Sequence, residues 1–469
     1  MSNKNKTLKI TPILITINIV LLLVMASYYI YRAVYYYLEE NGERVGSDIV
    51  YLGSHIIKQQ SYLDETKGLV YNDEKNIYTY KGNVKDNYLY YSGIMFRIIG
   101  IDNENNVRAV VDKNLTIMYS GLEKGYDKSY IRKWMNILED TDNSGIFMNN
   151  LYSSDEILSH SYICNDVIDD VTKITCDDNT NNDYVSLLSL NDYSAAGGKE
   201  SYLNNGENFY LNTVNSDNNN YIVSTSGDIV LNNIYTRAYG VRPVITINAN
   251  TNLYAGDGTE KNPYIIEKHQ IEVLSDAYVG EYVNLSGQNY KIISLGEKVL
   301  LAGVDAIKDE EKYVESKFGS TSKYAASSTV GKYLNDKFYN SLEEKDLLIR
   351  SHWYVGSNSM SNLDYGTKYS AKIGANVGML SLGDLFIHEV TNVFTMTRGI
   401  ESDIVIEVIN EDGNLYGDLV NKSYGMRPAF YLSGNLLLDS GEGTIEKPYV
   451  LGGEKDVEET EGTEETKEE

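Results

Sequence analysis

The chain is poor in basic residues. It carries 41 Lys and Arg against 67 Asp and Glu, which gives a formal net charge of −26. Nucleic-acid binding depends on clustered Lys and Arg that neutralise phosphates. We therefore expect no nucleic-acid partner, and an acidic surface of this kind is suited to solubility.

Histidine and the short motifs of common enzymes are also scarce. The histidines form no spaced cluster, and neither the zinc-protease helix nor the Gly-x-Ser-x-Gly turn of serine hydrolases is present. The segment from Asp140 to Gly145 matches the first half of a calcium loop, but Leu151 stands where the bidentate glutamate belongs. A polar turn is the favoured interpretation of that segment. We expect no metal, no cofactor and no enzyme activity. The five histidines are His55, His160, His269, His352 and His388.

Only two cysteines are present, Cys164 and Cys176. One pair without a CxxC motif or paired histidines gives no support for a zinc site. The two residues flank a short acidic segment, so they can meet across a turn in an oxidising compartment. The sequence favours a local disulfide, and two free thiols are the alternative.

Proline is rare, with 5 residues, whereas hydrophobic residues make up 42% of the chain and aromatic residues 11%. A chain of 469 residues with this composition can bury the cores of two or three domains. This composition excludes disorder throughout the chain.

One long hydrophobic run is present, over residues 10–31, and its length matches the roughly 20 residues that cross a bilayer. Lysines precede the run and acidic residues follow it, so the positive-inside rule places the N-terminus in the cytoplasm. We expect a single-pass anchor in the cell membrane, with everything after Arg32 outside the cell. A signal peptide cleaved after Ala26 is the alternative.

A repeated order of short segments organises the rest of the chain. Gly240-Val241-Arg242-Pro243 in the first half matches Gly425-Met426-Arg427-Pro428 in the second, and each is followed at the same interval by Gly-x-Gly-Thr and then Pro-Tyr. Upstream, residues 185–190 match 377–382, and residues 133–136 match 332–335. The sequence therefore predicts two tandem copies of one structural unit.

Each copy is predicted to be an α+β domain. Residues 95–111 and 290–304 have the apolar alternation and central turn residues of an opening hairpin, and short helices, a loop-rich middle and further strands follow. The fold class is thus an N-terminal transmembrane helix followed by two tandem β-rich domains. The predicted divisions are 1–34 (cytoplasmic tip and anchor), 35–80 (juxtamembrane helix and lead-in), 81–268 (first copy), 269–452 (second copy) and 453–469 (disordered acidic tail).

The shared segments favour structural roles, and the segments that differ favour binding. We expect each repeated arginine to pair with an internal carboxylate and hold the fold together. Recognition is usually placed on loops carried by a rigid frame. The copies differ most over 153–183 and 352–375, and the second segment combines aromatic residues with Gly, Ser and Asn, a mixture suited to sugar or peptide surfaces. The predicted structural residues are Gly240, Arg242, Pro243, Gly425, Arg427 and Pro428, and the predicted binding residues are Trp353, Tyr354, Tyr365 and Tyr369.

The segment Lys81-Gly82-Asn83 and the two Gly-x-Arg-Pro elements resemble a domain family of unknown function, often found in tandem in surface proteins of low-GC Gram-positive bacteria. The family usually carries Trp-Arg in its opening hairpin, where this chain has Phe96-Arg97 and Tyr290-Lys291. The Gly-x-Arg ending also resembles C-type-lectin-like and formylglycine-generating-enzyme-like folds. That second resemblance implies a compact α+β unit whose termini pair.

The function expected from the sequence is a membrane-anchored binding or adhesion protein displayed at the cell surface, with a glycan or protein ligand. A pilin-like or envelope-assembly subunit is the alternative, because a single N-terminal helix with a tyrosine-rich extension resembles the stem of such proteins. An enzyme of the formylglycine-generating type is the third candidate. It is disfavoured because the cysteines lie in a loop of one copy only.

Overall fold

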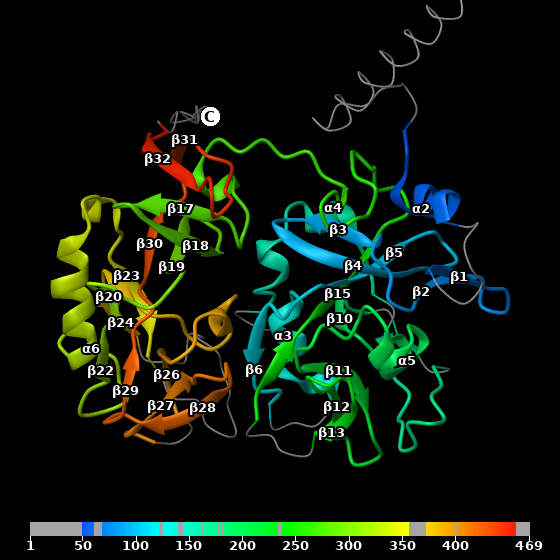
Figure 1. The fold of residues 1–469 in the computed structure, drawn as a ribbon, viewed down its shortest axis with the longest axis horizontal. Coiled ribbons are helices and arrows are strands. Elements are labelled where there is room, and N and C mark those ends of the chain that lie inside the picture. The colour runs from blue at the N-terminus through cyan, green and yellow to red at the C-terminus, as the bar shows by residue number, and fades with distance from the viewer. Residues whose placement is uncertain are drawn as a thin grey trace, which may run out of the picture.

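The computed structural model places the two copies side by side, with the first copy in blue to green and the second in green through yellow to red (Figure 1). Within the described residues, no helix is long and apolar enough to cross a membrane. The predicted span at 10–31 lies outside those residues. The structure describes residues 49–60, 68–121, 125–138, 144–161, 163–176, 179–180, 182–232, 237–355, 372–399 and 402–455.

The first copy is built on two antiparallel-rich sheets. The nine-stranded sheet has the order β1-β2-β4-β5-β15-β10 with β3, β7 and β16 paired alongside, and the five-stranded sheet has the order β13-β12-β11-β14-β6. Its nine strands are β1 (Gly68–Asn72), β2 (Ile77–Lys81), β3 (Tyr88–Tyr91), β4 (Ile94–Ile101), β5 (Val107–Val111), β7 (Leu158–Ser159), β10 (Val185–Leu187), β15 (Pro243–Ile247) and β16 (Tyr264–Ile265). The five are β6 (Thr116–Met118), β11 (Phe209–Val214), β12 (Asn220–Val223), β13 (Ile229–Asn232) and β14 (Tyr239–Val241). A small pair, β8 (Ile163–Cys164) and β9 (Asn179–Thr180), stands apart.

The second copy repeats this plan. Its seven-stranded sheet has the order β25-β30-β19-β18-β17-β32-β31, and its five-stranded sheet has the order β22-β29-β26-β27-β28. The seven strands are β25 (Val377–Gly378), β30 (Ala429–Ser433), β19 (Lys298–Gly303), β18 (Gln288–Ser294), β17 (Tyr282–Leu285), β32 (Tyr449–Glu454) and β31 (Leu436–Ser440). The five are β22 (Glu315–Lys317), β29 (Ser423–Gly425), β26 (Val393–Arg398), β27 (Val405–Ile409) and β28 (Leu415–Leu419). Two separate hairpins are β20 (Lys308–Asp309) with β21 (Lys312–Tyr313), and β23 (Ser351–Tyr354) with β24 (Lys372–Ala375).

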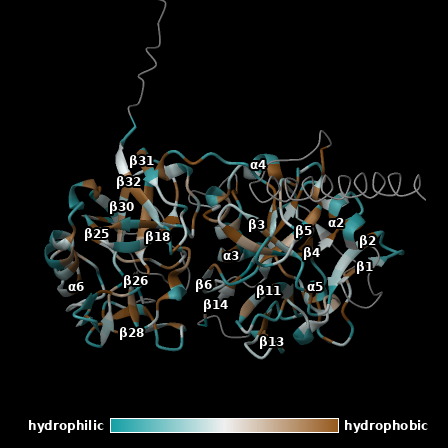
Figure 2. Ribbon diagram, turned by 45° about the horizontal axis from the view of Figure 1, so that its top comes forward, coloured by the Kyte–Doolittle hydropathy of each residue, from teal (hydrophilic) through white to brown (hydrophobic). Residues whose placement is uncertain are grey.

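Helices are short and lie beside the sheets. The two predicted opening hairpins are confirmed as β4–β5 and β18–β19. Figure 2 shows hydrophobic residues concentrated along the strands, with hydrophilic residues on the peripheral loops. The β-rich part of the predicted fold class is therefore present. The helices are α2 (Leu52–Gln60), α3 (Tyr130–Met135), α4 (Ser154–Ile157), α5 (Leu190–Ala195), α6 (Thr329–Lys332), the π-helix η5 (Tyr333–Phe338) and the 3₁₀ turn η8 (Ile387–Glu389).

Two predicted boundaries fall within strands of the sheets. The lead-in ends in β2, which pairs with β4 of the first copy (Tyr78 opposite Ile101), so these residues belong to the first sheet. At the other end, β32 runs past the predicted limit at residue 452 to Glu454, and the amide of Lys455 donates to the Asn435 carbonyl at 3.0 Å. The acidic tail from residue 456 onward lies outside the described residues.

The repeated arginines are buried in equivalent places. Arg242 is 1% exposed and donates to the carbonyls of Val111 (2.9 Å) and Leu203 (2.8 Å). Arg427 is 2% exposed and donates to the carbonyls of Gly303 and Phe386, both at 2.7 Å.

The predicted carboxylate partner of these arginines is wrong, because each guanidinium satisfies chain carbonyls instead. The neighbouring residues support the expected structural role. Pro243 opens β15, and Pro428 immediately precedes β30. A Cβ on Gly240 would lie 2.0 Å from the Asn114 side chain, and a Cβ on Gly425 would lie 3.1 Å from the Asn392 carbonyl. The shared element therefore joins strands that are far apart in the sequence.

Candidate ligand-binding site

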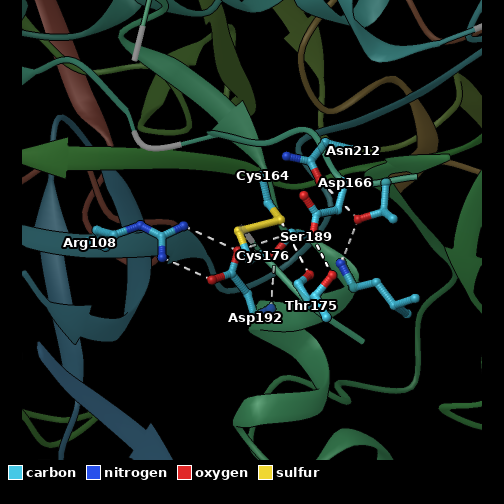
Figure 3. Close-up of a disulfide and its surroundings, with 10 residues drawn as sticks. Arg108, Cys164, Asp166, Thr175, Cys176, Ser189, Asp192 and Asn212 are labelled. Carbon is cyan, nitrogen blue, oxygen red and sulfur yellow. Dashed lines mark hydrogen bonds and ion pairs between the residues drawn. A yellow bond between two sulfur atoms is a disulfide. The ribbon is translucent and has the colours of Figure 1, made fainter. Parts of the chain in front are cut away.

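In each copy an extended loop begins at an equivalent point of the framework. In the first copy it spans residues 158–184 and is closed by the predicted Cys164–Cys176 disulfide, which is present, with the Cα atoms 5.5 Å apart. Figure 3 shows Asp166, Thr175 and Asn212 around this bond, and the Thr175 hydroxyl donates to the Asp166 carboxylate. The loop is fastened to β11 because the amide of Ile168 donates to the Val214 carbonyl at 3.0 Å.

A pocket of about 500 Å³ lies between this disulfide loop, the start of α3 and β11. Its volume falls in the range of small-molecule sites. Most of the lining side chains are polar, and four are asparagines. The lining residues are Gly125, Tyr126, Asp127, Arg132, Ile163, Cys164, Asn165, Asp166, Val167, Thr180, Asn182, Asp183, Asn212, Thr213, Val214 and Asn218.

One ion pair organises the wall of the pocket. Arg132 donates from Nε and Nη2 to the two carboxylate oxygens of Asp183 at 2.6 and 2.7 Å, and from Nη1 to the Asp127 carbonyl at 3.0 Å. The Asp183 side chain is 3% exposed and that of Arg132 is 27% exposed. The hydrogen bonds that Arg132 donates to Asp183 raise the pKa of Arg132 above its usual value. The guanidinium charge is therefore balanced within the wall.

The second copy contains matching positions that can be identified from shared hydrogen bonds. Asn136 Nδ2 donates to the carbonyls of Val185 (2.8 Å) and Arg132 (3.2 Å), and Asn335 Nδ2 donates to those of Val377 (3.0 Å) and Gly331 (2.9 Å). Gly331 therefore occupies the place of Arg132.

Two further lining positions are matched in the same way. The Ser161 amide donates to the Asp183 carbonyl, and Ser351 pairs with Ala375 in the β23–β24 hairpin. Each serine thus marks the residue opposite it as equivalent. The amides of Asn212 and Met396 donate to the carbonyls of Leu188 and Leu380, both at 2.9 Å. The second copy therefore has Ala375 for Asp183 and Met396 for Asn212.

In the second copy larger apolar side chains stand at two of these positions. Trp353, which matches Ile163, is 5% exposed, and its Nε1 donates to the Ala375 carbonyl at 3.0 Å. A Cβ on Gly378 would lie 2.7 Å from both the Met396 sulfur and the Trp353 ring, so these two side chains converge there. The Trp353 ring also lies 5.1 Å from that of Tyr431, centroid to centroid. The second copy thus has Trp353 and Met396 where the first copy has Ile163 and Asn212.

The predicted binding role of Trp353 is corrected to a structural one, because a buried ring with a satisfied N–H is not displayed to a ligand. Tyr354 is partly exposed and lies under Lys372, whose Nζ is 4.8 Å from the ring centroid. Tyr365 and Tyr369 lie outside the described residues. The structure therefore does not bring the four predicted residues together as a site.

The sequence analysis missed Arg132, Asp183 and Asn212 as candidate binding residues. The alignment of residues 133–136 with 332–335 contains the relevant signal, because it sets Arg132 against Gly331. A charged residue aligned with glycine in an otherwise shared segment marks a position that the common fold does not require.

Among the described residues no group of His, Cys, Asp and Glu is arranged to hold a metal ion. Comparisons with known proteins found no matching family model, no matching curated protein and no matching solved structure. The pocket in the first copy is the feature on which a functional argument can be based.

Proposed function

We propose that this chain is a membrane-anchored binding or adhesion protein, displayed at the cell surface, whose ligand enters the pocket of the first copy. The observation that carries the proposal is the contrast between the copies. Arg132, Asp183 and Asn212 line the pocket of the first copy, and Gly331, Ala375 and Met396 take their places in the second. Because the second copy keeps the framework without these polar groups, a role in recognition explains them better than a role in folding.

The pocket chemistry favours a neutral, hydroxyl-rich ligand such as one or two sugar units of a glycan. Asn165, Asn182 and Asn218 bring amide groups that can both donate and accept hydrogen bonds. Arg132 is already neutralised by Asp183, and Asp127 and Asp166 add negative charge to the lining. An anionic ligand would therefore meet net repulsion rather than a free cation.

Filling the pocket with a side chain from the second copy tests the proposal. Full-length chain purified in detergent is applied to a glycan array, and Asn212→Met is compared with the parent on every glycan that the parent retains. We expect at least a tenfold loss of binding, about 1.4 kcal/mol, because the methionine displaces the ligand from the pocket.

Asn103→Met makes the same chemical change at an exposed turn and serves as the matched control, with unchanged binding expected. Circular dichroism of both variants shows whether the fold is retained. Undiminished binding by a folded Asn212→Met chain would refute the proposed site. Failure of the parent to bind any glycan would refute the proposed ligand class.

The proposed display can be tested separately with intact cells. Protease added outside is expected to remove both copies and to leave a fragment near residues 1–32, because the charge bias around residues 10–31 orients the chain. Immunoblots against the two ends of the chain measure this outcome. Protection of the C-terminal end on intact cells, with digestion after lysis, would show that the orientation is wrong.

A further inference from the structure

The two copies meet along a seam made of hydrogen bonds and buried side chains. The Phe386 amide donates to the Leu115 carbonyl at 2.6 Å, so the segment entering η8 lies against β6. Trp134 Nε1 donates to the Gly383 carbonyl at 2.7 Å, and Thr116 Oγ1 donates to the Asp384 carbonyl at 2.9 Å. These contacts join residues that lie side by side at the centre of Figure 1.

A buried carboxylate sits in this seam. Glu407 in β27 is 2% exposed, and its Oε2 accepts a hydrogen bond from the Tyr119 hydroxyl of the first copy at 3.0 Å. Burial raises the pKa of Glu407 to about 7, and the bond from Tyr119 opposes part of that rise.

Among the residues that the structure describes, Glu407 forms no ion pair with a basic side chain. Across the seam Tyr119 faces it, with Tyr210 behind. Within its own sheet, Gly417 is its partner on β28, and Tyr416 and Asp418 flank that glycine. On β26, Arg398 is the basic residue, and it is bonded to Asp403. In this part of the chain the hydrogen bond to the Glu407 carboxylate comes from a tyrosine rather than from a basic side chain.

A second acid, Asp384, lies next to the same seam and is partly exposed. The carboxylate of Asp384 accepts the Ser381 amide at 2.6 Å, and burial raises its pKa to about 6 although the charge of Arg427 opposes the shift. The matching acid of the first copy, Asp192, is held by Arg108 in a bidentate ion pair. Ala109 of β5 and Leu301 of β19 are equivalent positions in the sheets of the two copies. Leu300 of the second copy therefore takes the place of Arg108 of the first.

We propose that this seam is a proton-sensitive latch, which holds the two copies together while Glu407 is protonated and opens more readily when Glu407 loses its proton. The physical reason is that an ionised carboxylate is costly to bury without a cation, and opening the seam returns it to water. The latch is independent of the ligand pocket, which lies within the first copy.

The direction of the pH effect follows from the two protonation states. Glu407 has a reference pKa of 4.5 when exposed and about 7 in the closed seam, so the closed form binds the proton more tightly. Raising the pH from about 5.5 to about 8.5 should therefore increase the opening equilibrium constant roughly thirtyfold through Glu407 alone. Acidification should reverse this contribution, whereas His388 of η8 acts in the opposite sense, because burial lowers its pKa and opening the seam favours its protonated form.

Trp134 reports on the seam because it is 2% exposed and bonded across it. The chain has 2 tryptophans, so Trp353→Phe leaves Trp134 as the single fluorophore. Acrylamide quenching of the full-length Trp353→Phe chain is measured from pH 5.5 to 8.5. We expect quenching to rise with pH in this parent, and to rise much less when Glu407→Gln is added.

Glu411→Gln in the exposed β27–β28 turn is the matched control and should keep the parental pH profile. As a second measurement on the unmodified chain, exchange of the Phe386 amide, corrected for the intrinsic pH dependence, should accelerate in parallel. A flat profile in both measurements would overturn the latch. So would a Glu407→Gln chain that keeps the parental slope.

Discussion

Arg242→Ala is expected to destabilise the first copy by on the order of 4 kcal/mol. The substitution removes two hydrogen bonds from a charged donor, leaves the carbonyls of Val111 and Leu203 without that partner, and opens a cavity beside Phe209, whose ring centroid lies 4.6 Å from the guanidinium carbon. Urea unfolding followed by Trp134 fluorescence measures the change. Arg427→Ala should cost a similar amount in the second copy, because its two carbonyl contacts are equivalent.

Two controls separate this effect from a general loss of charge. Arg350→Ala removes an exposed arginine that donates to the Gly374 carbonyl, and it should change the free energy of unfolding by less than about 0.5 kcal/mol. Arg242→Lys should recover little stability, because an ammonium group lacks the planar fork that reaches two carbonyls. A stable Arg242→Ala chain that has lost ligand binding would instead move Arg242 from the framework to the site.

Replacing both Cys164 and Cys176 by serine is expected to cost the first copy about 3 kcal/mol, because the disulfide closes a loop with a sequence separation of 12 residues. The same change should weaken ligand binding, since Cys164, Asn165 and Asp166 line the pocket and the loop would no longer be held against β11. Thermal unfolding and glycan binding of the full-length double variant provide the two measurements.

The second copy serves as an internal control for the disulfide. The chain has 2 cysteines, both in the first copy, so unfolding reported by Trp353 in a Trp134→Phe background should not change when the cysteines are replaced. Reduction of the unmodified chain should reproduce the loss of binding. Full binding by the double serine variant would show that the loop does not need the bond to form the pocket wall.

Much of the framework could be predicted because its information is local. The apolar alternation around a turn marks the opening hairpins, and the Gly-x-Arg-Pro element marks the start of β15 and β30 in both copies. The partners of Arg242 and Arg427 were less accessible. Their carbonyl acceptors lie up to 131 residues away in the chain, and a backbone carbonyl is available at every position. Sequence therefore indicated burial of the arginine but not what it bonds.

The candidate site was mislocated for a related reason. Aromatic residues among Gly, Ser and Asn are typical of exposed recognition loops, and Trp353 has that sequence context. Its burial depends on Gly378, which leaves room for the ring, and on Met396, which fills the remaining space. No local pattern around Trp353 contains either fact.

By itself, the sequence determined the tandem organisation, the cysteine pair and the framework residues, because repeated segments and short-range pairings are visible along the chain. Only the tertiary structure decided which copy holds an open pocket. That outcome depends on the volumes of side chains that converge from separate elements, Ile163 and Asn212 in one copy against Trp353 and Met396 in the other. It also decided that Glu407 is buried at a seam, since burial of a charge is a property of the surfaces that meet and not of the residue type.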